Sequence, residues 1–304
     1  MSIYHKSVFL TEALELLQIK KNKKYIDATL GGGGHTFEIL RKNGIVLGID
    51  LDTEAIEHVK VKWKKIVKEE KLSEENLILK KGNFRKLEEI ARLNEFEKVA
   101  GIIYDLGVSS NQIDRGERGF SYLKQGPLDM RMDENAQVKA SDLVNVLKKG
   151  ELYEIFSRFG QEHRAWVISD SIVRTRRIRA IQTTDDLIDV IREAYKIKSK
   201  DISPFLKAKI AKKVFQALRI AVNSEFENLK ETLPQAVNLL DRKGRLIVIS
   251  FHSIEDRIVK HKFLEFEKQG LGKIITKKPL IPTVEEMREN SRSKSAKLRV
   301  FEKI

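Results

Sequence analysis

A glycine-rich loop that follows an acidic residue is the first part of the chain whose residue types suit a binding site. Residues 27–35 read Asp-Ala-Thr-Leu-Gly-Gly-Gly-Gly-His. Glycines let the backbone approach a ligand closely, and the first N–H groups of a helix that follows can bind a carboxylate or a phosphate. Nicotinamide enzymes have the pattern G-x-G-x-x-G, but the sixth position after Gly31 and Gly33 is Thr36. The loop therefore predicts a ligand site and weakens the case for a dehydrogenase.

Two further candidates follow along the chain at the spacing that a nucleoside would require. Asp50 stands nineteen residues beyond Gly31, where a carboxylate can accept hydrogen bonds from both ribose hydroxyls of an adenosyl group; Asp52 competes for that role. Phe84 follows the next apolar segment and offers an aromatic face that can stack on adenine. Each feature also has a structural explanation, since an Asp after a strand is commonly a helix N-cap. Their order and spacing together predict an adenosyl cofactor.

These residues sit at the ends of apolar segments that alternate with helical patterns. Strands are expected at residues 25–29, 45–50, 77–79 and 99–105, with helices after Gly34 and over residues 55–67. Strands and helices that alternate in this way indicate a parallel sheet covered on both faces. Ligands bind such sheets beyond the carboxyl ends of the strands, which is where the candidates lie.

The alternation stops after Asp105, and helical patterns take over. Apolar residues recur at helical spacing in residues 152–159 and 187–194, and Thr183 with Asp186 forms the capping box of the second helix. Between Ser171 and Phe215 there are twelve Lys or Arg against five Asp or Glu. Such a surplus is as common on a plain solvated helix face as on a nucleic-acid surface. We expect a helical insertion in the sheet domain.

The sheet pattern resumes in the last third of the chain. A helix is predicted from Phe215 to about Leu240, broken or kinked near Pro234, and residues 246–250 form a short apolar strand. A basic tail over residues 288–299 leads into an apolar stretch at 298–301, which is expected to form an edge strand.

Composition narrows the partners and the chemistry. The formal net charge of +14 favours a polyanionic partner, with nucleic acid as the leading class. The chain has no cysteine, so disulfides, Cys-ligated zinc and a thiolate nucleophile are excluded. Its six histidines show no metal-binding spacing, and we expect no metal. The start of the chain has no apolar signal region and no later apolar run is long enough to span a bilayer, which predicts a soluble, cytoplasmic protein without a membrane partner.

Longer blocks carry a more specific resemblance. The acidic strand end with G-x-G resembles the first motif of class I methyltransferases. Asp105-Leu-Gly-Val-Ser-Ser at the end of the fourth strand resembles one family in particular, the bacterial ribosomal RNA small subunit methyltransferase H family, which N4-methylates a cytidine of 16S ribosomal RNA in the decoding region. The blocks that match run from end to end of the chain: residues 5–8, 31–35, 105–112, 118–120, 127–133, 215–223, 249–260 and 292–299.

The resemblance implies a fold, a cofactor and a partner. The fold would be α/β, a class I methyltransferase Rossmann-like sheet formed by residues 1–110 and 216–304, with an inserted, mainly helical substrate-recognition domain at residues 111–215. The cofactor would be S-adenosylmethionine, and the partner ribosomal RNA, either free or in the small subunit, with a homodimer left open. The cofactor contacts carried over are Gly33, Gly34, His35, Asp50, Phe84, Asp105 and Gln112.

Two departures from the family pattern concern RNA contact alone. Relatives have His-Pro-Ala-Thr-Arg where this chain has Lys209-Ile-Ala-Lys-Lys213, and Asn-Pro-Arg where it has Asn290-Ser291-Arg292. Neither lies in the cofactor motifs.

The expected reaction needs alignment and a hydrogen-bond acceptor. The methyl group of a sulfonium is already activated, so the protein must mainly place the attacking atom in line and exclude water. Methylation of cytosine carbon 5 requires a cysteine adduct, which this chain cannot form. The N4 amine is a poor nucleophile, and an acceptor for one N–H would stabilise its developing charge. The candidates for this catalytic role are Asp105 first, then Asp129 and His252.

Structural explanations compete with each catalytic candidate. The alternative for Asp105 is a contact with the cofactor only, which is the role that the resemblance implies. Asp129 lies in residues 127–133, which are interpreted as a wall of the substrate site but would also suit a packed loop with one ion pair to Arg131. Ser253 with Asp256 matches a capping box, so the block around His252 is expected to be partly structural.

Three other functions remain open from the sequence. A DNA amino-methyltransferase would have Pro-Pro and an aromatic residue at the fourth strand, where this chain has Asp105-Leu-Gly-Val. A non-catalytic RNA-binding assembly factor could retain the fold, and intact cofactor motifs argue against it. A nicotinamide dehydrogenase is disfavoured by Thr36.

Overall fold

The computed structural model describes residues 7–199 and 201–304, which fall into two compact units. The helical unit contains Val108–Glu225, and the sheet unit combines the described residues up to Gly107 with Phe226–Ile304. The sequence placed the insertion at residues 111–215. Its second boundary falls inside α10 (Pro204–Asn223), a helix that belongs wholly to the helical unit. The first boundary differs from the prediction by a few residues.

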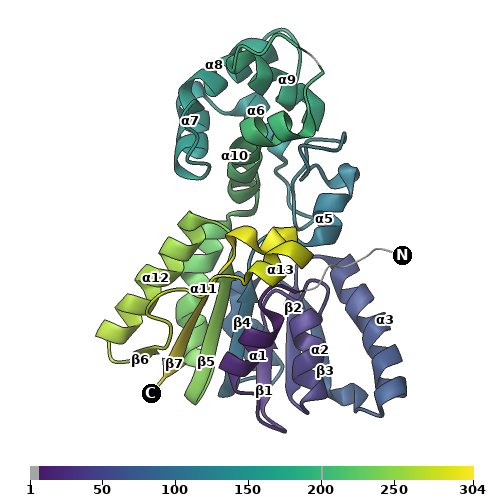
Figure 1. Cartoon of the computed structure of the whole chain (residues 1–304), viewed down its shortest axis with the longest axis vertical. Coiled ribbons are helices and arrows are strands. Elements are labelled where there is room, and N and C mark those ends of the chain that lie inside the picture. The colour runs from purple at the N-terminus through teal and green to yellow at the C-terminus, as the bar shows by residue number, and fades with distance from the viewer. Residues whose placement is uncertain (1–6, 200) are drawn as a thin grey trace. The chain divides into compact units, whose positions relative to one another are not determined.

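The sheet unit is built on seven strands. Their order is β3-β2-β1-β4-β5-β7-β6 (Figure 1). Neighbours from β3 to β5 pair in parallel, whereas β7 is antiparallel to both β5 and β6. The α/β class is therefore confirmed, with a mixed sheet in place of a purely parallel one. The strand bounds are β1 (Lys24–Asp27), β2 (Ile45–Asp50), β3 (Leu77–Lys81), β4 (Val99–Asp105), β5 (Leu240–Ser250), β6 (Gly272–Ile274) and β7 (Lys297–Lys303).

The strand predicted at residues 298–301 is present, but its predicted position at the edge is wrong. Residues 298–301 of β7 are all buried, because β5 pairs with one side of β7 and β6 with the other. The one charged residue within this run, Arg299, is also buried. It is 6% exposed, and its Nε lies 2.6 Å from Oδ1 of Asp256.

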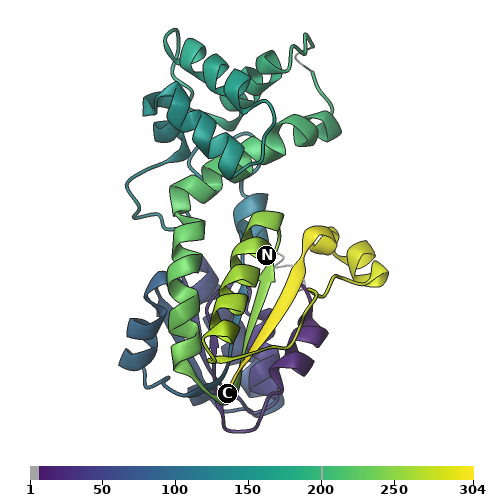
Figure 2. The same ribbon diagram turned by 90° about the vertical axis from the view of Figure 1, so that its left-hand side faces the viewer.

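Helices cover both faces of the sheet and bury its apolar side chains. One face carries α4 (Leu87–Leu93), α11 (Glu225–Leu239) and α12 (Ser253–Lys268), whose side chains form one hydrophobic cluster with the strands. The other face carries α1 (Leu10–Leu17), α2 (Gly34–Arg41) and α3 (Thr53–Glu70). Figure 2 shows the two layers on either side of the sheet. Burial on both faces explains why the strands appear as continuous apolar runs.

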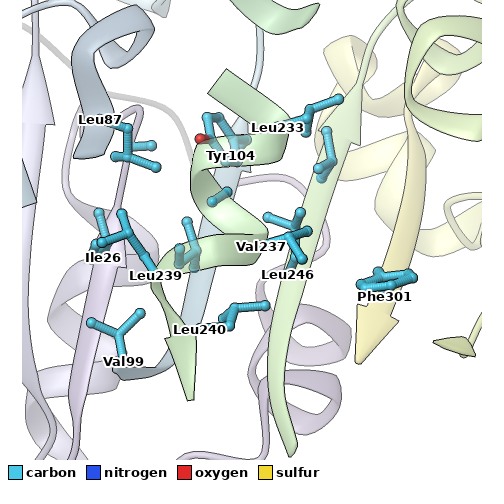
Figure 3. Close-up of a cluster of buried hydrophobic side chains, with 14 of the residues drawn as sticks. Ile26, Leu87, Val99, Tyr104, Leu233, Val237, Leu239, Leu240, Leu246 and Phe301 are labelled. Carbon is cyan, nitrogen blue, oxygen red and sulfur yellow. The ribbon is translucent and has the colours of Figure 1, made fainter. Parts of the chain in front are cut away.

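The connection back into the sheet differs from the prediction of one helix broken at Pro234. Helix α10 ends at Asn223, because Ser224 adopts a left-handed conformation with φ 49°. Helix α11 then runs through Pro234 without ending there. Leu233 and Val237 of this helix pack against the sheet residues Tyr104 and Leu246 in the cluster shown in Figure 3. Burial of these side chains offsets the hydrogen bond that proline cannot donate.

The helical unit has its own core. Its helices are α5 (Ser110–Asp114), α6 (Ala140–Val146), α7 (Lys149–Arg158), α8 (Ala165–Arg176), α9 (Thr184–Ala194) and α10. Their buried faces form a separate hydrophobic cluster, which includes Phe156, Ile168 and Leu187. The predicted capping box is confirmed, since the Thr183 side chain accepts from the Asp186 amide and Asp186 accepts from the Thr183 amide.

A short helix and a 3-10 turn precede the last strand. Helix α13 (Val284–Glu289) ends just inside the predicted basic tail at residues 288–299, and the turn η4 (Ser291–Ser295) lies within it. Asn290 accepts from the Arg292 amide and begins the 3-10 turn. Within the residues that the structure describes, no helix has the length and apolarity needed to cross a membrane.

Candidate cofactor and acceptor site

Three aspartates end three neighbouring strands of the sheet unit. Asp27 ends β1, Asp50 ends β2 and Asp105 ends β4, and the order β2-β1-β4 makes these strands adjacent. The carboxyl ends of parallel strands share one edge of the sheet, so the three carboxylates gather there. The sequence located this edge correctly.

The glycine loop is shaped by the packing of the protein itself. Gly33 is the N-cap of α2 with φ 76°, and a Cβ at this position would lie 2.9 Å from atoms of Phe37 and Val59. Thr36, the residue that replaces the expected third glycine, donates its hydroxyl to Oδ2 of Asp27 at 2.7 Å. Burial raises the pKa of the Asp27 carboxyl to about 6, although this hydrogen bond opposes the shift. Thr36, which departs from the dinucleotide pattern, thus holds the buried carboxyl of Asp27 in place.

Ser7 and Val8 lie against the start of α2. A Cβ on Gly34 would come within 2.1 Å of the Ser7 hydroxyl, so only glycine allows this approach. His35 is buried, and its Nε2 lies 3.1 Å from the carbonyl oxygen of Val8. A carbonyl can only accept, so Nε2 carries the proton and Nδ1 is free of one in the neutral ring. The first two residues of the matching block at 5–8 lie outside the described residues.

Asp50 is held in place by backbone amides. Its Oδ2 accepts from the Gly31 amide at 2.8 Å and its Oδ1 from the Asp52 amide at 2.9 Å. Burial raises the pKa of the Asp50 carboxyl to about 6. The Leu51 amide is a third backbone donor to this carboxylate. A carboxylate has about four acceptor positions, so one remains for the predicted contact with ribose hydroxyls. The competing candidate Asp52 accepts from the Glu54 amide as the N-cap of α3, a structural role.

Phe84 begins the short 3-10 turn η2 (Phe84–Lys86) after β3. Its ring is partly buried and meets the ring of Tyr104 edge to face, with the centroids 5.7 Å apart. Tyr104 is fixed in turn by a 2.6 Å hydrogen bond to the Thr232 hydroxyl. The aromatic side chain is therefore oriented by neighbours on β4 and α11, and its predicted stacking on adenine remains a prediction.

Asp105 has the most perturbed carboxyl of the edge. Its backbone amide donates to the Thr29 hydroxyl at 2.6 Å, while its Oδ1 is buried and has no hydrogen-bond partner among the residues that the structure describes. Oδ2 lies 3.9 Å from Nδ1 of His35. Burial, followed by the nearby carboxylates of Asp27, Glu255 and Glu286, raises the pKa of Asp105 to about 8. The separation from Nδ1 is too long for a hydrogen bond, and burial lowers the pKa of His35 to about 4, so the two side chains form no ion pair near neutral pH.

Two acidic residues of this cluster were missed by sequence reasoning. Glu286 of α13 accepts from the Phe9 amide through Oε1 at 2.7 Å, and its Oε2 is buried with no hydrogen-bond partner in residues 7–199 and 201–304. Glu255 of α12 is 2% exposed and accepts from the Phe251 amide at 2.9 Å. In sequence, Glu286 looks like the end of a capping box with Thr283, whose hydroxyl does accept from its amide at 3.1 Å. No local pattern indicates its contact with a residue 277 positions away.

His252 is the N-cap of α12, so the predicted capping box of Ser253 with Asp256 is wrong by one residue. The Nδ1 atom of His252 accepts from the Glu255 amide at 3.4 Å, and Nε2 lies 3.0 Å from Oε1 of Glu255. Asp256 instead pairs with Arg299. Capping occupies one ring nitrogen of His252, and its catalytic role remains a prediction.

The other two predicted site residues belong to the helical unit. Gln112 is 5% exposed, and its Oε1 accepts from the Ser109 amide at 3.0 Å. Asp129 accepts from Nε and Nη2 of Arg131 at 2.7 and 2.8 Å, and these contacts with Arg131 lower its pKa against the effect of burial. The ion pair matches the packed-loop alternative for residues 127–133. The catalytic role of Asp129 and the cofactor contact of Gln112 are not tested by this geometry.

The loop that carries Asp129 is tightly packed. A Cβ on Gly119 would lie 2.2 Å from the Pro127 carbonyl oxygen, and the Met130 amide donates to the Arg118 carbonyl at 3.0 Å. Asn223 of α10 donates to the Met130 carbonyl and accepts from the Met132 amide. The matching blocks at 118–120, 127–133 and 215–223 therefore meet in one place within the helical unit.

Comparison with known proteins decides the family. The model of the MraW methylase family matches residues 2–304. The chain belongs to the MraW methylase family. The protein called ribosomal RNA small subunit methyltransferase H in Clostridium botulinum (strain Loch Maree) is 43% identical over 323 residues and covers 100% of both chains. The protein of the same name in Oenococcus oeni is 43% identical over 318 residues and covers 98% of each.

Membership makes this chain a methyltransferase that uses S-adenosylmethionine on a class I sheet, as the sequence predicted. The acidic edge fits such a cofactor, which carries a positive sulfonium, an amine and ribose hydroxyls. Asp105 Oδ1 is a buried acceptor for which the described residues supply no donor, and Asp50 is a second carboxylate at the same edge. Among the described residues, no group of three or more His, Asp or Glu is arranged to hold a metal ion.

Proposed function

We propose that this methyltransferase transfers a methyl group from S-adenosylmethionine to the N4 amine of a cytidine in the decoding region of 16S ribosomal RNA. The names of its full-length relatives support a target in small-subunit ribosomal RNA. The specific blocks of the chain support the N4 position, and the absence of cysteine excludes the usual route to carbon 5. The partner on this proposal is the RNA within the small subunit. The proposal is the same for a monomer and for a homodimer.

The observation that carries the proposal is the buried Oδ1 of Asp105 at the end of β4, which has no hydrogen-bond partner within the described part of the chain. When bound, the cofactor supplies an activated methyl group that needs no metal. The protein must then hold the amine in line and accept one of its N–H groups as positive charge develops on nitrogen. Asp105 has the acceptor atom for this, and as a carboxylate it can also take the proton that the methylated nitrogen releases.

Cofactor binding would be shared by residues that the structure already orients. Asp50 would hold the ribose hydroxyls, Phe84 would stack on the adenine, and the first amides of α2, which follow the Gly33 cap, would face the cofactor carboxylate. A cationic cofactor near Asp105 would lower the pKa of this residue from about 8 and favour its carboxylate form. Binding thus prepares the acceptor for catalysis.

The test uses methyl-labelled cofactor and small ribosomal subunits that lack native methylation. After digestion, the labelled nucleoside is identified by mass, and label in N4-methylcytidine is the expected result. Label in any other nucleoside would overturn the proposed target. No label despite cofactor binding would support the non-catalytic assembly factor instead.

Variants separate the acceptor role from cofactor binding. Asp105→Asn removes the proton acceptor, and we expect turnover to fall by about 100-fold or more, as for the loss of a general base. Asp241→Asn is a matched control, because this exposed carboxylate lies at the opposite end of the sheet, after the start of β5. Full turnover of Asp105→Asn with bound cofactor would refute the acceptor assignment and leave the target untouched.

A further inference from the structure

An aromatic and basic surface on the helical unit has no role in the site described above. The α7–α8 face consists of Lys149 and Tyr153 on α7 and of Trp166, Asp170 and Arg174 on α8. The Trp166 side chain is 55% exposed and Tyr153 is 37% exposed. The chain has one other tryptophan, Trp63, which is 3% exposed and stacks near Phe37 in the sheet unit.

The helical pattern places Trp166 on the outside of α8. Ala165, Ile168 and Ile172 point into the core, whereas Trp166, Asp170 and Arg174 are spaced four residues apart and share the opposite side. Helices α7 and α8 pack side by side, so residues of α7 border this stripe (Figure 1). An exposed tryptophan in such a place is not needed for the core and points to an interaction.

The indole of Trp166 is held in place by its neighbours. The ammonium of Lys149 lies 4.0 Å from the ring centroid, and the ring of Tyr153 meets the indole edge to face at 5.6 Å. The Lys149 ammonium is itself fixed by Asp170 Oδ1 at 2.7 Å, while Asp170 Oδ2 lies 3.3 Å from Nε of Arg174. A ring oriented in this way loses little conformational freedom when a ligand stacks on it.

The chemistry of the face matches an unpaired nucleotide. Aromatic rings beside lysine and arginine bind single-stranded nucleic acid, because bases stack on the rings and the cations attract the phosphates. Residues 148–177 contain seven Lys or Arg against four Asp or Glu. The apolar part of the face is small and is bordered by cations, which favours a polyanion over an apolar protein surface.

We propose that the α7–α8 face binds a single-stranded segment of RNA, with one base stacked on Trp166 beside Tyr153. Lys149 and Arg174 contact the phosphates of that segment. This inference rests on the proposed function for the identity of the partner as RNA. It adds a contact surface formed by residues other than those of the acidic strand edge, and it assigns the stacking contact to one residue.

The two tryptophans allow a direct test by fluorescence. Titration with a short unstructured RNA oligonucleotide should quench the emission of the exposed Trp166 and leave that of the buried Trp63 unchanged. The same strand annealed to its complement should quench much less, since its bases are already stacked. In Trp166→Phe, which leaves Trp63 as the sole tryptophan, the quenching should disappear.

Affinity measured with a labelled oligonucleotide separates stacking from simple apolar contact. Trp166→Ala should weaken binding by about 5- to 100-fold, the range expected for loss of one stacked base. Trp166→Leu keeps an apolar side chain without an aromatic face and should bind as weakly as the alanine variant, whereas Trp166→Phe should stay within about threefold of the parent. Arg174→Gln should reduce the slope of log affinity against log salt by about 0.7.

The matched control is Val61→Ala, which trims an apolar side chain that is 68% exposed on α3 of the sheet unit. Its affinity for RNA should not change. Unchanged affinity and unchanged quenching across the Trp166 variants would overturn the proposal. Normal RNA affinity with lost self-association in Trp166→Ala, seen by sedimentation, would show a protein interface and would overturn it as well.

The proposed function fails separately from this inference. The position of the methyl group is measured by the mass of the nucleoside, whereas the α7–α8 face is measured by RNA affinity in the absence of cofactor. A parent protein that labels a different nucleoside refutes the N4 target but leaves the Trp166 result valid. A parent protein that forms N4-methylcytidine while all Trp166 variants bind RNA normally refutes only the role of the α7–α8 face.

Discussion

Replacement of Asp105 by asparagine should stabilise the protein at high pH, which is unusual for a change in a functional site. The native pKa of Asp105 is raised from 3.8 to about 8, so the folded protein keeps a proton that the unfolded chain loses near pH 4. Stability from this group is therefore fully present at low pH and is lost as the pH rises from about 4 to about 8. An asparagine side chain does not ionise, so the variant does not lose this stability as the pH rises.

The magnitude follows from the size of the shift. One pKa unit corresponds to about 1.4 kcal/mol, so a shift from 3.8 to about 8 corresponds to about 6 kcal/mol once the native carboxyl is ionised. Because 24% of the side chain is exposed, water and relaxation stabilise the ionised form in part, and we expect less than half of that value. The variant should exceed the parent by about 2 kcal/mol at pH 8 and match it within about 0.5 kcal/mol at pH 4.

Urea unfolding without cofactor at several pH values measures this difference. In a Trp166→Phe background, the emission of the buried Trp63 reports on the sheet unit alone. Asp27 and Asp50, each with a pKa raised to about 6, lower the stability of parent and variant alike, so comparison of the two isolates Asp105. The reasoning is refuted if the difference does not grow with pH, or if Asp241→Asn gives the same gain.

Three other substitutions test the geometry of the edge, each by urea unfolding. Thr36→Ala removes the hydroxyl donor of the buried Asp27 and should cost about 1–3 kcal/mol, while Thr36→Ser should recover most of it; equal costs would contradict the hydrogen bond. His252→Ala should lower the free energy of unfolding by about 0.5–2 kcal/mol through loss of the cap of α12, and His252→Asn should restore it. Low methyl transfer in the stable asparagine variant would support the catalytic assignment of His252. Gly33→Ala places a Cβ 2.9 Å from neighbouring atoms at φ 76° and should lower the free energy of unfolding by more than about 2 kcal/mol. Gly31→Ala has its nearest atom at 3.8 Å and should lower it by about 1 kcal/mol. Similar losses in the two variants would show that steric crowding is not the cause.

The sequence predicted the local elements and the edge that carries the site. Apolar runs located β2 and β4 to the residue, because strands buried on both faces have few polar interruptions. The positions of Asp50 and Asp105 at the ends of these strands were therefore also predicted correctly. The three-residue strand β6 (Gly272–Ile274) gave no signal, because so short a run shows no period. Its absence from the prediction is also why β7 was expected at the edge.

Features that depend on distant residues were the ones missed. The contact of Glu286 with the Phe9 amide joins the two ends of the chain, and no local pattern can encode it. The break between α10 and α11 falls at Ser224 and not at Pro234, because the packing of α11 on the sheet overrides the breaking tendency of proline. The cap of α12 was predicted at Ser253 and not at His252, because serine is by far the more common capping residue.

The charge of the edge explains why this Rossmann-like sheet suits a sulfonium cofactor and not a dinucleotide. A dinucleotide places a pyrophosphate at the glycine loop, where its anionic oxygens need nearby donors and no competing carboxylates. Here Asp27 lies under that loop, and Asp105 is close enough to Asp27, Glu255 and Glu286 for their charges to raise its pKa. Such a cluster repels phosphate and attracts a cation.

The same repulsion acts on the RNA backbone, although the chain as a whole carries a charge of +14. On the proposed function, basic residues away from this edge would hold the phosphates while a single uncharged base enters it. Binding would then depend both on the acidic edge and on basic surfaces elsewhere on the chain.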